Sequence, residues 1–357
     1  MGGRDVFPLY GALTPEQQNR AVEQGKNPRV IVSTNVAETS LTIEGVRTVI
    51  DSGLVRRSGW DPYRGMDTLH LTKISKASAA QRAGRAGRVA PGRCFRLWSE
   101  AEQARKADFD PPECFRVDLA GAVLNLAAWG ITAPEGFRWL DAPDPLVMQR
   151  AVNLLAALGA TEADGSLTDV GRRMTAFPLP PRLARLMAAG QDEQCVVELA
   201  AIAALMQGEG VAMKGGLNDN LRDSADYTDF QAEWRAVEKA VDAVFEAGAG
   251  TRWGISARGA REVWMAYRQL LSIGSRGKSR EMPEPDFTAA RPAVVRAMME
   301  SFADHVGVRN GVAANTCRMA GGVGGRLAEG SVAFHGEHFV AAEVAELSGK
   351  AVETRVG

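Results

Sequence analysis

The sequence predicts a multidomain protein in which an α/β domain is followed by helical domains and a short β-rich region. Three observations support this prediction. Two short apolar runs flank a polar loop near the N-terminus, helical periodicity dominates from about residue 113 to residue 302, and apolar residues alternate among glycines after residue 303. A chain of 357 residues is long enough for roughly two to four domains.

Composition is that of an ordinary globular protein, with 45% hydrophobic and 24% charged residues. The apolar runs are short, so no membrane-spanning helix is expected. Four cysteines without metal-ligand spacing favour a reducing cytoplasm over a disulfide scaffold, and no metal site is expected. The net charge is −1, yet residues 71–106 hold nine Lys or Arg and two Asp or Glu, which indicates an anionic partner for this stretch.

In the α/β region, residues 29–33 and 46–51 are predicted strands, and the turn-rich segment 54–72 is a predicted β-hairpin. The loop between the two strands is polar. Because open α/β sheets place ligands at the ends of their strands, this loop is a candidate binding segment.

Helices are predicted after the Pro111-Pro112 pair. Asp118 is a candidate cap for a helix that ends at Gly130, and Asp144 for one that ends at Gly159. Short strand and turn patterns follow to about residue 181, and the combination indicates a winged-helix unit. Beyond it, helical spacing predicts one buried face formed by Phe230, Trp234, Val237, Val241 and Phe245. After residue 303, segments 332–334 and 338–340 are predicted strands.

The most specific motif is Gln81-Arg82-Ala83-Gly84-Arg85-Ala86-Gly87-Arg88, which has an arginine at every third position and small residues between. We expect a helix here, with Arg85 and Arg88 on one side and Arg82 partly turned away. Forked guanidinium groups aimed at one point suit the oxygens of a triphosphate. The alternative is a solvated basic helix, which seldom has so regular a pattern.

The second motif, residues 33–46, follows the first predicted strand and gathers hydroxyl side chains with Glu38 and Glu44. Hydroxyls and backbone N–H groups hold phosphates, and a carboxylate suits ribose hydroxyls. The alternative is a capped turn without a ligand.

Together the two motifs resemble motifs V and VI of the DEAH-box helicases of superfamily 2. Further segments are similar to the hairpin and helicase-associated regions of that family: residues 51–54, 61–65, 91–97, 112–119, 139–143 and 179–184. The segments at 8–13 and 179–184 look most like the bacterial HrpB branch.

The resemblance implies a fold of four parts. Residues 1–108 would be a RecA-like domain of the P-loop NTPase type, the second in the family, without its first strands. Residues 109–178 would be a winged helix, residues 179–302 a ratchet-like helical bundle, and residues 303–357 the beginning of a β-rich domain similar to an oligonucleotide-binding barrel.

The resemblance also implies site residues. Gln81, Arg85 and Arg88 would face the γ-phosphate of ATP and its attacking water, with the arginines as fingers. Thr42 and Glu44 would lie near the nucleotide ribose, although many relatives carry Asp in place of Glu44.

For RNA, the resemblance implies contacts from Thr34 and Asn35 to the backbone of the strand. Arg29 ends a segment, residues 25–29, that loosely matches a hook-like turn which grips RNA in the family. No site is carried over beyond about residue 210, where the sequence matches poorly.

The sequence contains no G-x-x-x-x-G-K-[ST] phosphate loop. Residues 272–279 come close, but Ser272 occupies the first glycine position, so we expect an exposed loop. Residues 192–195 mimic the start of a D-E-x-H box without a preceding strand, and are expected to cap a helix. The first RecA-like domain, which would hold Mg²⁺ and cradle ATP, is therefore expected outside this chain, as is the start of the second. Alone, the chain is expected to be inactive.

The residues leave two other functions open. The chain could be a non-catalytic RNA-binding or scaffold protein, which the missing phosphate loop favours and the intact arginine motif disfavours. It could also belong to a DNA-directed helicase, because contacts to a phosphate backbone do not distinguish the sugar.

Overall fold

The computed structural model describes most of the chain, in two compact units. Contacts assign residues 1–59 and 69–116 to the first unit, and residues 60–68 and 117–357 to the second. The described residues are 5–11, 13–23, 27–39, 43–61, 66–208, 210–213, 216–275, 283–311, 314–320, 322, 324–328, 330–347 and 351–355.

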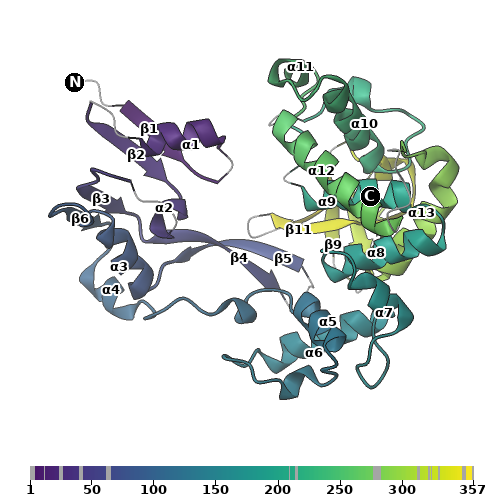
Figure 1. The fold of residues 1–357 in the computed structure, drawn as a ribbon, viewed down its shortest axis with the longest axis horizontal. Helices are drawn as coiled ribbons and strands as arrows, with labels where there is room; N and C mark the ends of the chain where they lie inside the picture. Colours follow the sequence, from purple (N-terminus) through teal and green to yellow (C-terminus); the bar gives the residue numbers. More distant parts are fainter. Residues whose placement is uncertain are drawn as a thin grey trace. The chain divides into compact units, whose positions relative to one another are not determined.

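The first unit is α/β (Figure 1). Strand β1 (Asp5–Leu9) pairs in parallel with β2 (Arg29–Ser33), and helix α1 (Pro15–Val22) connects them. A capping box between Thr14 and Gln17 begins α1. The predicted strand at 29–33 is therefore confirmed, and the short helix α2 (Val36–Thr39) follows it directly.

A second parallel pair joins β3 (Thr48–Asp51) to β6 (Arg93–Arg96). Between them in sequence come β4 (Leu54–Asp61) and β5 (Met66–Lys73), which form the expected two-stranded hairpin, and then helix α3 (Lys76–Gly84). Helix α4 (Glu100–Arg105) closes the unit. The motif at residues 33–46 thus lies on the connection that leaves the parallel strand β2, where open α/β sheets bind ligands, whereas the motif at residues 81–88 follows the hairpin strand β5.

The second unit begins with helices whose caps match the sequence patterns. Helix α5 (Ala120–Ala128) starts where the Asp118 carboxylate accepts the Ala120 N–H at 3.0 Å, and α6 (Pro145–Ala157) starts at its N-cap Asp144. The chain leaves both helices through glycines with positive φ, Gly130 and Gly159. Helix α7 (Asp169–Met174) follows.

The core of the second unit is a set of helices packed around α9 (Val196–Gln207). Every residue from Leu199 to Leu205 is buried, as expected for a helix segment that is apolar all round. The other helices of this core are α8 (Pro181–Asp192), α10 (Asp229–Asp242), α11 (Ala247–Thr251), α12 (Ala257–Gly274) and α13 (Phe287–Phe302).

Two stretches of this helical region test the sequence prediction. Phe230, Trp234 and Val237 are buried on α10 as predicted, but Phe245 lies beyond the end of the helix with a left-handed φ of 56°. Residues 192–195 lead into a helix as predicted, because Cys195 is the N-cap of α9, although no side-chain hydrogen bond caps it. Asp192 ends α8 and forms an ion pair with Arg173 at 2.7 Å.

A six-stranded sheet in the order β10-β7-β8-β9-β12-β11 ends the described chain. Its core contains Cys317, Met319, Leu327 and Phe339. The strands are β7 (Val306–Arg309), β8 (Thr316–Met319), β9 (Gly324–Leu327), β10 (His338–Val340), β11 (Glu343–Leu347) and β12 (Ala351–Arg355).

The strand predicted at 332–334 is wrong, because residues 332–335 form a 3₁₀ turn. The Asp229 carboxylate accepts the Ser331 hydroxyl and the Val332 N–H, both at 2.7 Å. A sheet ladder would need that N–H, so the side-chain contact competes with strand pairing.

Among the described residues, none of the helices combines the length and the hydrophobicity that crossing a bilayer requires. The same residues contain no cluster of three or more His, Cys, Asp or Glu side chains that could hold a metal ion.

His305 joins α13 to the sheet, and we predict that it makes the second unit sensitive to acid. Its Nδ1 lies 3.0 Å from the Ala341 carbonyl oxygen. Burial, and then the nearby Arg182, lower the pKa of His305 below its ordinary 6.5, although Asp304 opposes this. The unfolded chain therefore binds the proton more tightly, and the free energy of unfolding should fall as the pH is lowered from 7.5 to 5.5.

Thermal melts of the chain at the two pH values test this, with His305→Gln as the comparison. The variant should lose less stability on acidification than the natural chain. Equal losses would show that His305 does not carry the effect.

Candidate functional site

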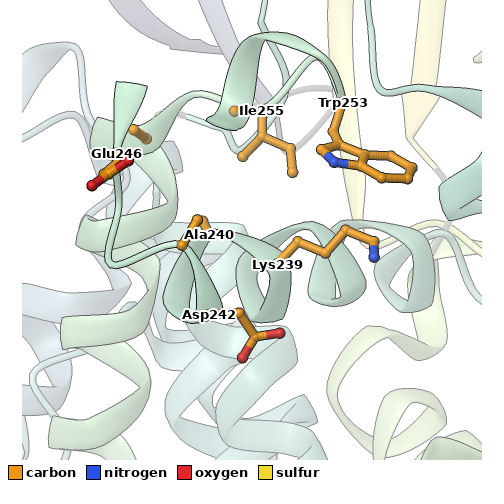
Figure 2. A pocket seen from close by; sticks show the side chains of 9 residues that line it. Lys239, Ala240, Asp242, Glu246, Trp253 and Ile255 are labelled. Carbon is orange, nitrogen blue, oxygen red and sulfur yellow. The ribbon is translucent and has the colours of Figure 1, made fainter. Parts of the chain in front are cut away.

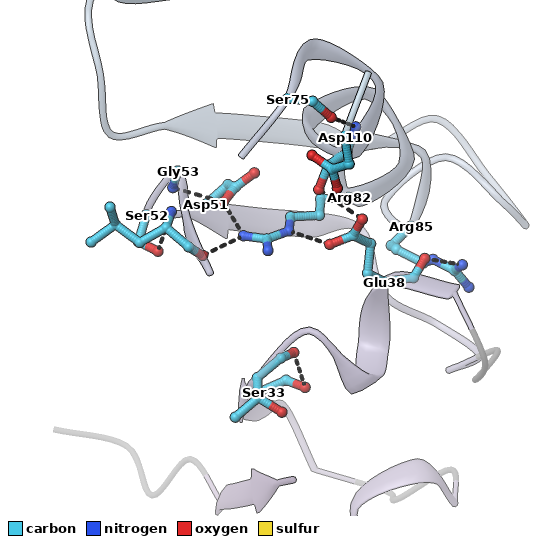
Figure 3. A network of polar contacts seen from close by, with 12 residues as sticks. Ser33, Glu38, Asp51, Ser52, Gly53, Ser75, Arg82, Arg85 and Asp110 are labelled. Carbon is cyan, nitrogen blue, oxygen red and sulfur yellow. Dashed lines mark hydrogen bonds and ion pairs between the residues drawn. The ribbon is translucent and has the colours of Figure 1, made fainter. Parts of the chain in front are cut away.

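A polar network joins the two motifs of the first unit (Figure 3). The Glu38 carboxylate, on α2, accepts the Ser78 hydroxyl at 2.7 Å and the Arg82 Nε–H at 2.9 Å, both from α3. The Arg82 and Glu38 side chains are only 15% and 13% exposed. At this burial a charged pair is poorly screened by water, so it holds α2 firmly against α3.

Arg82 also reaches the end of β3. Its Nη1 donates to Asp51 Oδ1 at 3.0 Å and to the Leu54 carbonyl oxygen at 3.1 Å, while Oδ1 of Asp51 also accepts the Gly53 N–H at 2.9 Å. Burial alone would lower the pKa of Arg82, but the hydrogen bonds to Glu38 and Asp51 raise it above its ordinary value. Arg82 is therefore a fixed charge that connects α2, α3, β3 and β4.

The continuous helix predicted for residues 81–88 is wrong. Helix α3 ends at Gly84, Arg85 is its C-cap, and Arg88 lies in the turn that follows. Backbone hydrogen bonds tighten the turn, from the Ala86 N–H to the Ala83 carbonyl oxygen and from the Gly87 N–H to that of Gly84. Arg85 and Arg88 therefore come together on a turn rather than on one face of a helix.

Gly92 allows this turn to pack closely. A Cβ at Gly92 would lie 2.0 Å from the Ala86 carbonyl oxygen and 2.8 Å from that of Arg47, so no larger residue fits. The backbone of the arginine turn thus rests directly against the chain that enters β6.

Arg85 is held by α2 as well, because its guanidinium donates to the Glu38 carbonyl oxygen. Partial desolvation, and then the positive charge of Arg88, lower the pKa of Arg85. Arginine stays protonated over the whole physiological range despite such shifts. The turn therefore gathers two cations, which is what an anionic ligand requires.

The remaining predicted nucleotide residues are less constrained. Gln81 is exposed on α3, and Glu44 is exposed in the turn at Gly45. Thr42 lies outside the described residues.

Of the predicted RNA residues, Thr34 and Asn35 are exposed immediately after β2, where Asn35 offers its carbonyl oxygen to the Glu38 N–H at 2.9 Å. The Arg29 guanidinium donates to the Val22 and Glu23 carbonyl oxygens at the end of α1, and its contact to RNA stays a prediction. These bonds satisfy the carbonyl groups of a helix C-terminus.

Known proteins match the chain in sequence and in fold. The model of the helicase conserved C-terminal domain matches residues 2–90, and that of the helicase-associated HA2 winged-helix domain matches residues 151–179. The chain is 40% identical over 204 residues to the pre-mRNA-splicing factor ATP-dependent RNA helicase prp22 of Schizosaccharomyces pombe. These matches support similarity of the chain to the C-terminal portion of the DEAH-box helicases of superfamily 2.

Two crystal structures of Escherichia coli HrpB, one described as a DExH-box NTPase and one as a DEAH/RHA helicase, match 99% of the chain with a TM-score of 0.74 and 28% and 29% identity. The family resemblance and the predicted fold class are therefore confirmed, whereas the domain boundaries stay predictions. The chain spans 39–40% of the HrpB chains and 18% of the prp22 helicase.

Sequence patterns assign Arg82 no structural role, whereas its contacts in the structure predict that it stabilises the first unit. Arg82→Ala would leave the Glu38 and Asp51 carboxylates buried without their cation, and should cost about 3–5 kcal/mol of unfolding free energy. Arg82→Lys should not restore it, because an ammonium cannot reproduce the fork. Urea unfolding monitored by fluorescence measures the loss.

The matched control is Arg88→Ala, since Arg88 is exposed and lies on the same motif. This variant should change the free energy of unfolding by no more than about 0.5 kcal/mol. Equal stability of the Arg82 and Arg88 variants would contradict the role assigned to the network.

Proposed function

We propose that the chain supplies the arginine side of the nucleotide site in an ATP-dependent RNA helicase. The observation that carries the proposal is the turn bearing Arg85 and Arg88, which the Glu38–Arg82 network fixes beside α2. A scaffold protein would have no need of two arginines held in this way. The other RecA-like domain of such a helicase, the first in the family, would carry the phosphate loop, the DEAH box and the carboxylates that hold Mg²⁺.

In this proposal, ATP binds between the two RecA-like domains. The guanidinium groups of Arg85 and Arg88 then donate to oxygens of the transferring phosphoryl group, where charge rearranges in the transition state. Gln81 orients the attacking water, and Glu44 and Thr42 lie near the ribose. Hydrolysis converts the γ-phosphoryl group to inorganic phosphate, and once that phosphate is released the arginines lose their bound anion and the domains separate.

RNA would bind through Thr34 and Asn35, with contacts mainly to its phosphates, and repeated opening and closing would move the strand and remodel its structure. The basic stretch at 71–106 adds attraction for the backbone. A DNA strand remains the second candidate substrate, favoured only by the same backbone chemistry. No disulfide joins the four cysteines, all of which lie in the described part of the chain, and we infer action in a reducing cytoplasm.

The arginine assignment predicts a large loss of catalysis. In a protein that joins this chain to a RecA-like domain with a phosphate loop and a DEAH box, Arg85→Ala or Arg88→Ala should each lower kcat about 10³-fold or more at saturating RNA. The chain alone should not hydrolyse ATP. Lysine at either position should not rescue activity, because it lacks the planar fork.

Phosphate release measures kcat, and circular dichroism melts show whether each variant is folded. Near-normal kcat in both folded alanine variants would rule out their role as fingers.

Binding to RNA should be weak and should depend strongly on salt, because phosphate contacts release counterions. Fluorescence anisotropy with a single-stranded RNA at low and high salt tests this on the chain alone. Binding that salt leaves unchanged, or no binding at low salt, would argue against the proposed contacts. The same measurement with a DNA strand of the same sequence shows whether binding depends on the ribose.

A further inference from the structure

A cavity of about 400 Å³ lies in the first unit, on elements other than the arginine turn and α2. Its lining comes from β4, β5, the start of α3, and α4 with the segment that follows it. The volume is within the range of sites that bind small molecules.

The charges on this lining do not balance. Arg57 forms an ion pair with Asp110 at 2.7 Å, and Lys73 forms one with Glu102 at 3.1 Å. These pairs use both carboxylates of the lining. Two further cations, Arg105 and Lys106, have no carboxylate partner among the described residues.

Lys106 is the more unusual of the two, because only 7% of it is exposed. Its Nζ has no hydrogen-bond acceptor within the described part of the chain and lies 4.6 Å from the centroid of the Trp98 ring. The aromatic ring replaces part of the lost hydration, but it accepts none of the three N–H groups in an ordinary hydrogen bond. A buried ammonium without an acceptor is costly unless an anion reaches it.

Two hydroxyl groups on the lining add donors. Ser75 and Ser99 are the N-caps of α3 and α4, and their oxygens accept the Ser78 and Glu102 N–H groups at 3.1 Å. Each hydroxyl proton is left to donate, so the cavity offers donors on several sides.

We propose that this cavity binds a dianionic phosphate, either inorganic phosphate or the phosphate of a small monoester. A dianion matches the two uncompensated cations, Arg105 and Lys106. An internal phosphodiester of a nucleic acid carries one charge and has a sugar on each side, which keeps it from a buried ammonium. The volume exceeds the needs of phosphate alone and leaves room for a small organic group.

A second cavity, of about 340 Å³ in the other unit, provides a matched contrast (Figure 2). There Lys239 lies over Trp253, also 4.6 Å from the ring centroid. Asp242 and Glu246 line that cavity, so it already holds carboxylates for its one lysine. Stacking of lysine on tryptophan alone therefore predicts no anion site.

The test is isothermal titration of the full chain with inorganic phosphate and with adenosine monophosphate, at constant ionic strength, with chloride as the reference. Lys106→Met should weaken phosphate binding about 10- to 100-fold, since hydrogen bonds to charged groups are the strong ones. Arg105→Gln, at an exposed position, should weaken it while leaving the fold intact. Lys239→Met should leave the affinity unchanged.

Two results of these titrations would overturn the proposal. One is that phosphate and the monoester bind no better than chloride. The other is that binding survives in folded Lys106→Met and Arg105→Gln chains but is lost in Arg85→Ala, which would place the anion on the arginine turn. Binding of phosphate but not of the monophosphate would identify the free ion as the ligand, and the reverse would identify an organic monoester. Displacement by an RNA without terminal phosphate would also contradict a small-molecule site.

Discussion

The guanidinium group of Arg82 is the interaction on which the candidate site depends. It binds the carboxylates of Glu38 and Asp51 and the carbonyl oxygen of Leu54, and so ties together segments that lie far apart in the sequence. Asp51 is almost fully buried, and one of its carboxylate oxygens has no partner within the described residues. A carboxylate in that position needs a fixed cation nearby, and Arg82 provides it.

The arrangement of the other arginines follows from this constraint. Once Arg82 fixes α2 against α3, the Glu38 carbonyl oxygen lies within reach of the Arg85 guanidinium. Helix α3 ends at Gly84, and Gly92 lets the turn that carries Arg88 rest on the chain entering β6. The three arginines of the motif thus have different roles. Arg82 is structural, and Arg85 and Arg88 lie on a turn where they are available to bind a phosphate.

Much of the fold could be predicted from the sequence because local rules decide it. The strand at 29–33, the hairpin and the capped start of α6 all follow from patterns of a few residues. The prediction of a helix through Arg88 failed because two glycines and a tertiary contact at Gly92 end the helix earlier. Sequence periodicity does not report such contacts. The strand prediction at 332–334 failed for a similar reason. The 3₁₀ turn found there is bound by Asp229, which is about a hundred residues away in the sequence.

The candidate site was predictable in its motifs but not in its internal contacts. Arginines spaced by small residues indicate phosphate binding by themselves. The internal contacts depend on which elements lie side by side in the fold. Arg82 faces two carboxylates and Arg29 caps α1 for that reason. A crystal structure of a longer protein that includes the chain, with ADP and aluminium fluoride bound, tests the account most directly. The account predicts that Arg85 and Arg88 donate to the fluoride ligands while Arg82 stays on Glu38 and Asp51. Arg85 and Arg88 turned away from the bound nucleotide, or Arg82 in their place, would contradict it.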